Sequence, residues 1–193
     1  MAGKQAKALT DAQLRGVLAA VKSTKQPDRN TVMVLLSAKA GLRSKEIAAL
    51  TWSMVTTATG ELADTLQLPD KASKGRSGRT IPLNKELRTA LLTLQRATTP
   101  APADRVIRSE RGGGMSAAAV TNWFWTLYRS LGFDGCSSHS GRRTFITKAA
   151  RAVVAAGGSI RDVQELAGHS SLATTQKYIE GHTAAKARLV DMI

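Results

Sequence analysis

Residues 166–178 read LAGHSSLATTQKY, and this segment is the most informative part of the chain. It joins a short helix expected to end at Ala167 to a second helix expected over residues 172–179. His169 lies in the break between the two helices, nine positions before Tyr178. Either side chain taken singly would be interpreted as packing, so their meaning depends on the segments that precede them.

Upstream, the tetrapeptide HSGR places His139 and Arg142 at the start of a predicted helix. Side chains three positions apart share one face of a helix, and the positive end of the helix dipole attracts an anion there. An arginine in such a place offers parallel N–H donors that match two phosphate oxygens. The pattern indicates a phosphate contact, with a solvated helix face as the alternative for so short a motif.

Two further basic segments lie in the first half of the chain. The segment GLRSKE, residues 41–46, places Arg43 just before a predicted helix and Glu46 in its first turn, where the dipole favours an anion. A capping or salt-bridge role is the alternative for Arg43. The second segment is a predicted hairpin turn with the cationic residues Lys71, Lys74, Arg76 and Arg79.

Taken together and in this order, these segments resemble the tyrosine recombinase, or phage integrase, family. The resemblance rests on Arg43 in GLRxxE, Lys74 in SKGxxxRTIPL, His139 and Arg142 in HxxR, and His169 and Tyr178 in LxGHSxLxTTxxY. The last box is highly specific for that family. The boxes cover most of the chain, from about residue 9 to residue 178.

The resemblance implies a metal-free attack on a DNA phosphodiester. Tyr178 would attack in line, forming a 3′-phosphotyrosine link and freeing a 5′-hydroxyl. Arg43 and Arg142 would hold the non-bridging oxygens of the scissile phosphate, where preorganised donors stabilise developing charge. Lys74 would protonate the leaving oxygen. Integration, excision, dimer resolution and inversion of DNA all use this chemistry, and the sequence does not choose among them.

Other residues take supporting roles under the same resemblance. His139 and His169 would hydrogen-bond the phosphate or assist proton transfer. Glu46 would hold Arg43 in place, with an ordinary surface carboxylate as an equal alternative. Lys74 is preferred over its basic neighbours because it lies in a Lys-Gly step just before the predicted second strand. Further DNA contacts are expected from Lys71, Arg76, Arg79 and Arg143.

No cofactor is expected. The transesterification of this family conserves bond energy, so ATP is not implied, and the chain contains no GxxxxGK[S/T] segment. The three histidines, the single cysteine and the scattered carboxylates show no spacing typical of a metal site.

Hydrophobic periodicity predicts a mainly α fold with one small antiparallel β-sheet. The resemblance implies the α+β catalytic-domain fold of tyrosine recombinases, the DNA breaking-rejoining fold. Thr10 and Gln13 form a capping box for the first helix, and Asp28 or Asn30 can cap the second. Helices are expected over residues 11–21, 32–39, 44–50, 84–99, 116–131, 139–156, 159–167, 172–179 and 183–192, and the sheet within residues 54–83.

Composition points to a polyanionic partner. The chain has 28 Lys and Arg against 14 Asp and Glu, a formal charge of +14, which favours nucleic acid over a membrane surface or no such partner. The family resemblance implies that the partner is double-stranded DNA. A single cysteine, Cys136, excludes an intrachain disulfide and favours the reducing cytoplasm, where the protein would associate with the nucleoid. Trp52, Trp123 and Trp125 are expected to pack in the core rather than to stack on bases.

The expected organisation is one catalytic domain over residues 1–193, with a flexible tail at residues 1–8. The N-terminal core-binding domain that many family members carry is expected to be absent, so the chain is either an excised domain or a minimal recombinase. In either case it should bind DNA more weakly, and with less sequence discrimination, than a two-domain relative. Because recombination joins four strands, a tetramer on two duplexes is the expected active form, with a monomer in free solution. Residues 183–193 would dock on a neighbouring protomer.

Two other functions stay open at this point. A type IB topoisomerase-like enzyme would share the Arg, Lys, His and Tyr chemistry while relaxing supercoils, although the GHSxLxTT box favours a recombinase. A DNA-binding protein that keeps the fold without cleavage is the other alternative. It is disfavoured because all six positions implied by the resemblance are filled.

Overall fold

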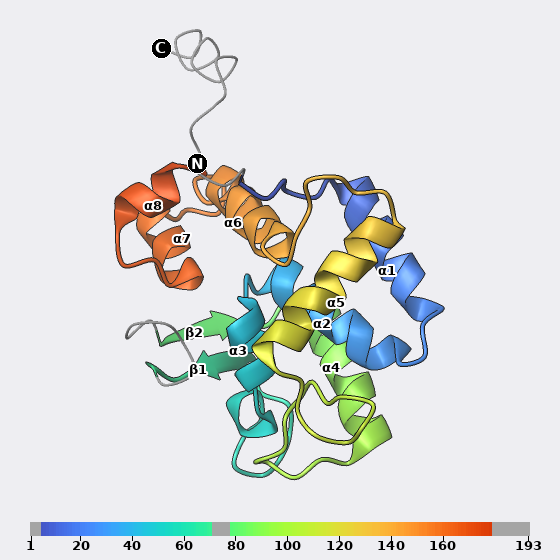
Figure 1. Cartoon of the computed structure of the whole chain (residues 1–193). Helices are drawn as coiled ribbons and strands as arrows, with labels where there is room; N and C mark the ends of the chain where they lie inside the picture. The colour runs from blue at the N-terminus through green and yellow to red at the C-terminus, as the bar shows by residue number, and fades with distance from the viewer. Residues whose placement is uncertain (1–4, 71–77, 179–193) are drawn as a thin grey trace, which may run out of the picture.

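Helix α2 (Pro27–Lys39) lies at the centre of the fold, which the computed structural model describes over residues 5–70 and 78–178 (Figure 1). Nine of its thirteen residues are buried. Helices α1 (Asp11–Lys22), α4 (Lys85–Thr98) and α6 (Ser140–Ala152) pack against it. The run VMVLL at residues 32–36 is apolar all round the helix because neighbours surround it.

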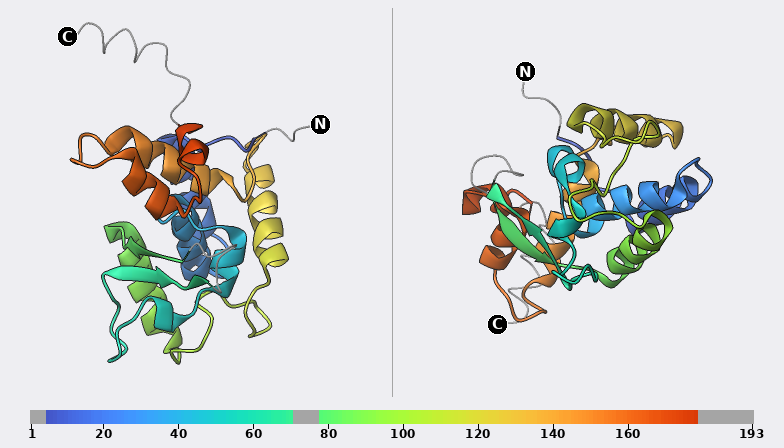
Figure 2. Two further views of the ribbon diagram at one scale, coloured as in Figure 1. Left: turned by 90° about the vertical axis from the view of Figure 1, so that its left-hand side faces the viewer. Right: turned by 90° about the horizontal axis from the view of Figure 1, so that it is seen from below.

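The order of the elements confirms the predicted mainly α fold with one small antiparallel sheet. The remaining elements are α3 (Ser44–Ala49), the 3-10 helix η1 (Trp52–Met54), β1 (Thr65–Leu68), β2 (Arg79–Pro82), α5 (Ala117–Ser130), α7 (Ile160–Ala167) and α8 (Leu172–Gln176). Helices α6, α7 and α8 gather on one side of the sheet, and α7 contacts β2 (Figure 2). Within the described ranges, no helix is both long and apolar enough to cross a bilayer.

Local capping signals account for where most helices begin. The Thr10 hydroxyl accepts a hydrogen bond from the Gln13 N–H, and the Gln13 side chain accepts one from the Thr10 N–H. This is the capping box predicted for α1. Asn84 and Ser116 each accept one backbone N–H at the starts of α4 and α5, and Ser159 begins α7.

The start of α2 differs from the prediction. The helix begins at Pro27, ahead of the predicted caps Asp28 and Asn30, because proline fits the first helical position, where no N–H partner is needed. Asn30 is buried inside the helix, where its amide donates to the Thr24 hydroxyl and accepts from the Arg29 guanidinium. The expectation of an Asx cap was therefore wrong.

Helix α6 is shorter than predicted. It ends at Ala152 because residues 153–157 continue as turns, and Gly157 has a φ of +75° that suits glycine. Helix α8 ends at Gln176. The helix predicted over residues 183–192 lies outside the described residues.

The sheet has the predicted antiparallel pairing. Leu66 lies opposite Ile81 and both are buried, whereas Gln67 and its partner Thr80 are exposed. This alternation is typical of a strand pair with one face on the core. The turn between the strands lies outside the described residues, and with it the predicted Lys71, Lys74 and Arg76.

The segment before α1 is held against the domain, which corrects the expectation of a flexible tail for its described part. The Lys7 N–H donates to the Gly135 carbonyl at 2.9 Å, and the Leu9 N–H donates to the Thr144 hydroxyl at 2.7 Å. Leu9 is itself buried. We call residues 5–9 the N-terminal strap.

The three tryptophans take two different environments. Trp52 is buried in the core, and Trp123 is half-buried and meets Phe124 edge to face. Trp125 is 53% exposed, with the Arg129 guanidinium 4.9 Å from its ring centroid. The prediction of core packing is confirmed for the first two and wrong for Trp125.

Gly141→Ala is expected to lower the free energy of unfolding by about 1–3 kcal/mol through overpacking. Helix α6 approaches α2 so closely at Gly141 that an added Cβ would lie 2.8 Å from Ser37 Cβ and 3.1 Å from the Ser37 carbonyl carbon. Urea denaturation would measure the change. The matched control is Gly16→Ala in α1, where nothing lies within 4 Å and the higher helix propensity of alanine should stabilise by up to about 1 kcal/mol. Equal effects of both substitutions would contradict this reading.

Candidate active site

An open cavity of about 1040 Å³ lies where α3, β2, α7 and α8 meet. Its wall includes Arg43, Arg79, His169 and Thr174. These residues come from distant parts of the sequence. Arg43 and His169 are predicted catalytic residues, and Arg79 is a predicted DNA contact. Glu46 pairs with Arg43 and Arg79 of this wall, and the Tyr178 ring stacks on His169.

Arg142 is buried, with an exposed fraction of 4%. Its Nη1 donates to the Gly41 carbonyl and its Nη2 to the Ala167 carbonyl, both at 2.6 Å. Burial, reinforced by the positive charges of Arg43 and Arg79, lowers the pKa of Arg142 to about 10. The guanidinium stays charged at neutral pH, is fixed by two backbone carbonyls, and keeps further N–H donors for an anion.

Glu46 lies among Arg43, Arg79 and Arg142 and is 1% exposed. Within the described structure it is the only carboxylate placed among these three arginines. It accepts hydrogen bonds from the Arg43 backbone N–H at 2.8 Å and from Arg43 Nη1 at 2.9 Å. Arg79 donates to both carboxylate oxygens at 3.0 Å. Burial alone would raise the pKa of Glu46, but the hydrogen bonds and charges of Arg79 and Arg43 outweigh it and lower the pKa. Glu46 is therefore an internal support for Arg43, and the surface-carboxylate alternative is wrong.

Arg79 occupies a different place from the DNA contact expected from the sequence. Its side chain is 5% exposed, and its Nε donates to the Leu166 carbonyl at 2.9 Å. It ties β2 to α3 through Glu46 and to α7 through Leu166. The alternation of side chains along β2 could have predicted that Arg79 is buried, because Arg79 and the buried Ile81 share one face of the strand.

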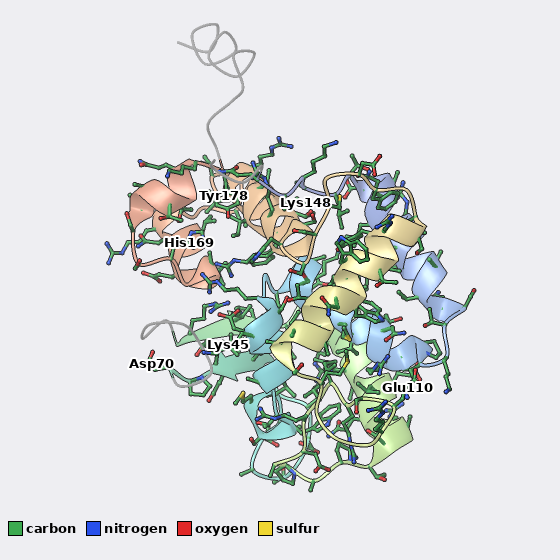
Figure 3. All side chains as sticks on the ribbon, viewed as in Figure 1. Lys45, Asp70, Glu110, Lys148, His169 and Tyr178 are labelled. Atoms are coloured by element: carbon green, nitrogen blue, oxygen red, sulfur yellow. The ribbon has the colours of Figure 1, made fainter. Side chains whose placement is uncertain are left out.

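His169 and Tyr178 lie side by side between α6 and α8 (Figure 3). Their ring centroids are 5.8 Å apart with an interplanar angle of 24°. His169 Nδ1 lies 2.9 Å from the Thr175 hydroxyl, a contact the sequence did not reveal. Burial first, then the charges of Arg142, Arg43 and Arg79, lower the pKa of His169 to about 4. The imidazole is therefore neutral at pH 7.

Comparison with known proteins decides the family. Residues 7–184 match the family model described as "Phage integrase family". The chain belongs to the phage integrase family. The tyrosine recombinase XerC of Rhizobium meliloti strain 1021 is 30% identical over 179 residues, a match that covers 89% of this chain and 53% of that protein. The XerC of Agrobacterium fabrum strain C58 is 30% identical over 192 residues, covering 96% of this chain and 58% of the relative. This phage integrase domain thus spans little more than half the length of those relatives.

Solved structures confirm the predicted catalytic-domain fold. The XerA recombinase has a TM-score of 0.73 at 22% identity, covering 100% of this chain and 65% of that one. The Tn1549 transposon integrase in complex with a circular intermediate DNA has a TM-score of 0.75 at 20% identity, covering 99% and 67%. At these identities the likeness concerns the phage integrase fold alone.

The remaining predicted residues of this integrase domain are less closely gathered. His139 is exposed at the residue before α6, whereas Arg142, one turn later, is buried. Arg143, predicted to contact DNA, lies with its guanidinium carbon 5.6 Å from the Tyr178 ring centroid. Lys74 is outside the described residues. Within residues 5–70 and 78–178, no group of three His, Cys, Asp or Glu could hold a metal ion.

The stability of this integrase domain should fall faster with acid than that of its His169→Gln variant. The folded pKa of His169, about 4, is below the value of 6.5 expected for an unperturbed histidine, so the unfolded state takes up a proton first as the pH falls. The shifted pKa of His169 has no effect on the free energy of unfolding above pH 7, and it lowers that free energy increasingly from pH 6.5 toward pH 4. Because the ring is half-buried, we expect a change of about 1 kcal/mol between pH 7 and pH 5, relative to the variant. Urea titrations at both pH values test this, and parallel pH profiles would contradict it.

Proposed function

We propose that this domain cuts and rejoins DNA at specific sites through a 3′-phosphotyrosine intermediate formed by Tyr178. The observation that carries the proposal is the position of the tyrosine, which stacks on His169 beside the buried, carbonyl-anchored Arg142. Arg43 completes the group from α3, held by Glu46. A nucleophile beside preorganised cations is what phosphoryl transfer without a bound cofactor requires.

The proposed reaction is a reversible transesterification. The Tyr178 oxygen attacks the phosphorus, the bond from phosphorus to the 5′-oxygen breaks, and the phosphate remains linked to the tyrosine. Arg43 and Arg142 neutralise the phosphate oxygens as charge develops. Lys74 supplies the proton to the leaving 5′-oxygen, while neutral His169 can accept the phenolic proton. Attack by a 5′-hydroxyl of another strand reverses these steps, and no bond energy is lost.

Double-stranded DNA is the proposed substrate. The charge of +14 supports it, as does the structurally similar Tn1549 transposon integrase, which was solved in complex with transposon right end DNA. Lys71 and Arg76 are proposed as further backbone contacts. We also propose a tetramer on two duplexes as the active form, since four strands are exchanged, and a cytoplasmic place beside the nucleoid. Integration and dimer resolution are both compatible with this chemistry.

Covalent capture on a pool of nicked duplexes with a randomised core tests the function without knowledge of the target. Cleavage next to the nick releases a short 5′-hydroxyl oligonucleotide, which diffuses away and leaves the protein attached to the 3′-phosphate. The attached DNA would be isolated on a denaturing gel and sequenced, and the linked peptide identified by mass spectrometry. We expect a link at Tyr178 and enrichment of one sequence.

Each other outcome would replace the proposal by a definite alternative. Capture at Tyr178 without any sequence enrichment, together with relaxation of supercoiled plasmid, would favour a topoisomerase-like enzyme. Retention of DNA under native conditions without any covalent link would favour a DNA-binding protein that does not cleave.

A further inference from the structure

Arg143 follows Arg142 directly in α6, yet its side chain reaches a different group. Its guanidinium carbon lies 5.6 Å from the centroid of the Tyr178 ring, within the roughly 6 Å at which an aromatic face attracts a cation. On the other side of the contact, Arg143 Nη1 donates to the Gln5 side-chain oxygen. Arg143 is half-buried. It therefore joins the N-terminal strap to the proposed nucleophile.

The described contacts of Tyr178 come from the segment that carries it and from α6 and α7. Tyr178 follows the five-residue helix α8, and its backbone N–H donates to the Thr175 carbonyl at 3.0 Å. Its ring packs partly on a small apolar cluster formed by Ile146, Val163 and Ala167, apart from the main core. Because this cluster is small within the described chain, the ring contacts of Tyr178 with His169 and Arg143 contribute strongly to where the phenol oxygen lies.

The strap is a firm support for Arg143. Two backbone hydrogen bonds, from Lys7 to Gly135 and from Leu9 to Thr144, attach it to the loop before α6 and to α6 itself. The Thr144 hydroxyl also donates to the Ser140 carbonyl, within the same helix. Gln5 is thus presented by a segment tied to the helix that carries Arg143.

We propose that Arg143 is a positioning residue for the nucleophile, with Gln5 of the strap fixing its guanidinium over the Tyr178 ring. This inference rests on the proposed function, and it replaces the earlier expectation that Arg143 contacts DNA. The strap then has a role in the reaction, because a change in the path of residues 5–9 alters where Tyr178 lies. The cation contributes by orientation of the ring, so the effect belongs to the rate of attack and not to DNA affinity.

The free protein offers a direct test, because the chain has two tyrosines, Tyr128 and Tyr178. With both labelled as 3-fluorotyrosine, ¹⁹F NMR gives two signals, assigned by Tyr178→Phe. Arg143→Ala should shift and narrow the Tyr178 signal while leaving the signal of buried Tyr128 in place. Gln5→Ala should shift the Tyr178 signal in the same direction by a smaller amount. Arg143→Lys should give a Tyr178 signal between those of wild type and Arg143→Ala, because the cation remains. An unchanged Tyr178 signal in Arg143→Ala overturns the proposal whether or not the protein cleaves DNA.

The second test uses the duplex captured by the wild-type protein. At saturating protein, Arg143→Ala should form the covalent adduct about 10- to 100-fold more slowly than wild type, a loss typical of a misplaced reactant. Its dissociation constant for the intact duplex should stay within about threefold. The matched control is Arg129→Ala, which removes the same charge and the same kind of contact, a guanidinium 4.9 Å from the Trp125 centroid, and should react at the wild-type rate.

The outcomes separate the two proposals. A wild-type adduct together with equal rates in Arg143→Ala and Arg129→Ala sinks the positioning role alone. A loss confined to DNA affinity in Arg143→Ala does the same, and returns Arg143 to the group of DNA contacts. Absence of a wild-type adduct counts against the proposed function, and the fluorine spectra then still decide whether Arg143 orients the ring.

Discussion

Tyr178→Phe should abolish covalent attachment to DNA while leaving the fold unchanged. The rate of adduct formation should fall by at least about 10³-fold. Phenylalanine keeps the ring that stacks on His169 and lies under Arg143, so only the attacking oxygen is lost. The free energy of unfolding should stay within about 0.5 kcal/mol of wild type, because only the phenol oxygen of a partly buried ring is removed. The adduct is measured on the captured duplex by denaturing gel, and binding to the same duplex is measured without denaturant.

Tyr128→Phe is the matched control for this prediction. Tyr128 is the other tyrosine of the chain, buried in the core and stacked on Phe124 with centroids 5.8 Å apart. Burial raises the pKa of its phenol, which keeps it protonated. The control should form the adduct at the wild-type rate. Adducts that persist in Tyr178→Phe would assign the nucleophile to another residue.

Glu46→Gln should lower the free energy of unfolding by about 3–5 kcal/mol at pH 7. Glutamine has nearly the same shape as glutamate, but it removes the negative charge between Arg43 and Arg79 and leaves their cations facing one another. The Arg79 side chain is 5% exposed and Glu46 only 1%, so water cannot replace the lost anion. Covalent capture should also weaken, because Arg43 loses the group that holds it. Urea denaturation measures the stability.

The pH dependence gives this prediction a second readout. The folded pKa of Glu46 is lowered, so its contribution to stability is present above the unfolded pKa and is lost as the pH falls through the lower folded value. The difference in the free energy of unfolding between wild type and Glu46→Gln should therefore be at its full size at pH 7. It should disappear only in acid, below about pH 4.5. Glu110→Gln, at the exposed pair with Lys25, should cost no more than about 1 kcal/mol. Equal losses in the two variants would contradict the buried role of Glu46.

Features that depend on neighbouring residues could be predicted from the sequence. The capping box of Thr10 and Gln13, the start of α5 at Ser116 and the pairing of β1 with β2 all follow from local hydrogen bonds and short-range alternation. The family was also accessible, because the spacing of His169 and Tyr178 is a property of the chain alone. Boundaries were less certain where a proline or a run of turns competed with the helical period, as at Pro27 and after Ala152.

Which charged residues are buried as internal supports depends on long-range packing, which the sequence does not reveal. Glu46 and Arg79 are 33 positions apart, and Arg142 and Gly41 are 101 apart, so no local pattern relates them. The two adjacent arginines of α6 show the same limit, since Arg142 binds backbone carbonyls while Arg143 lies over Tyr178. A buried charge must be paired or hydrogen-bonded, and packing alone determines which charges are buried. That is why the sequence could propose candidate site residues but could not predict which arginines are buried against carbonyls and carboxylates.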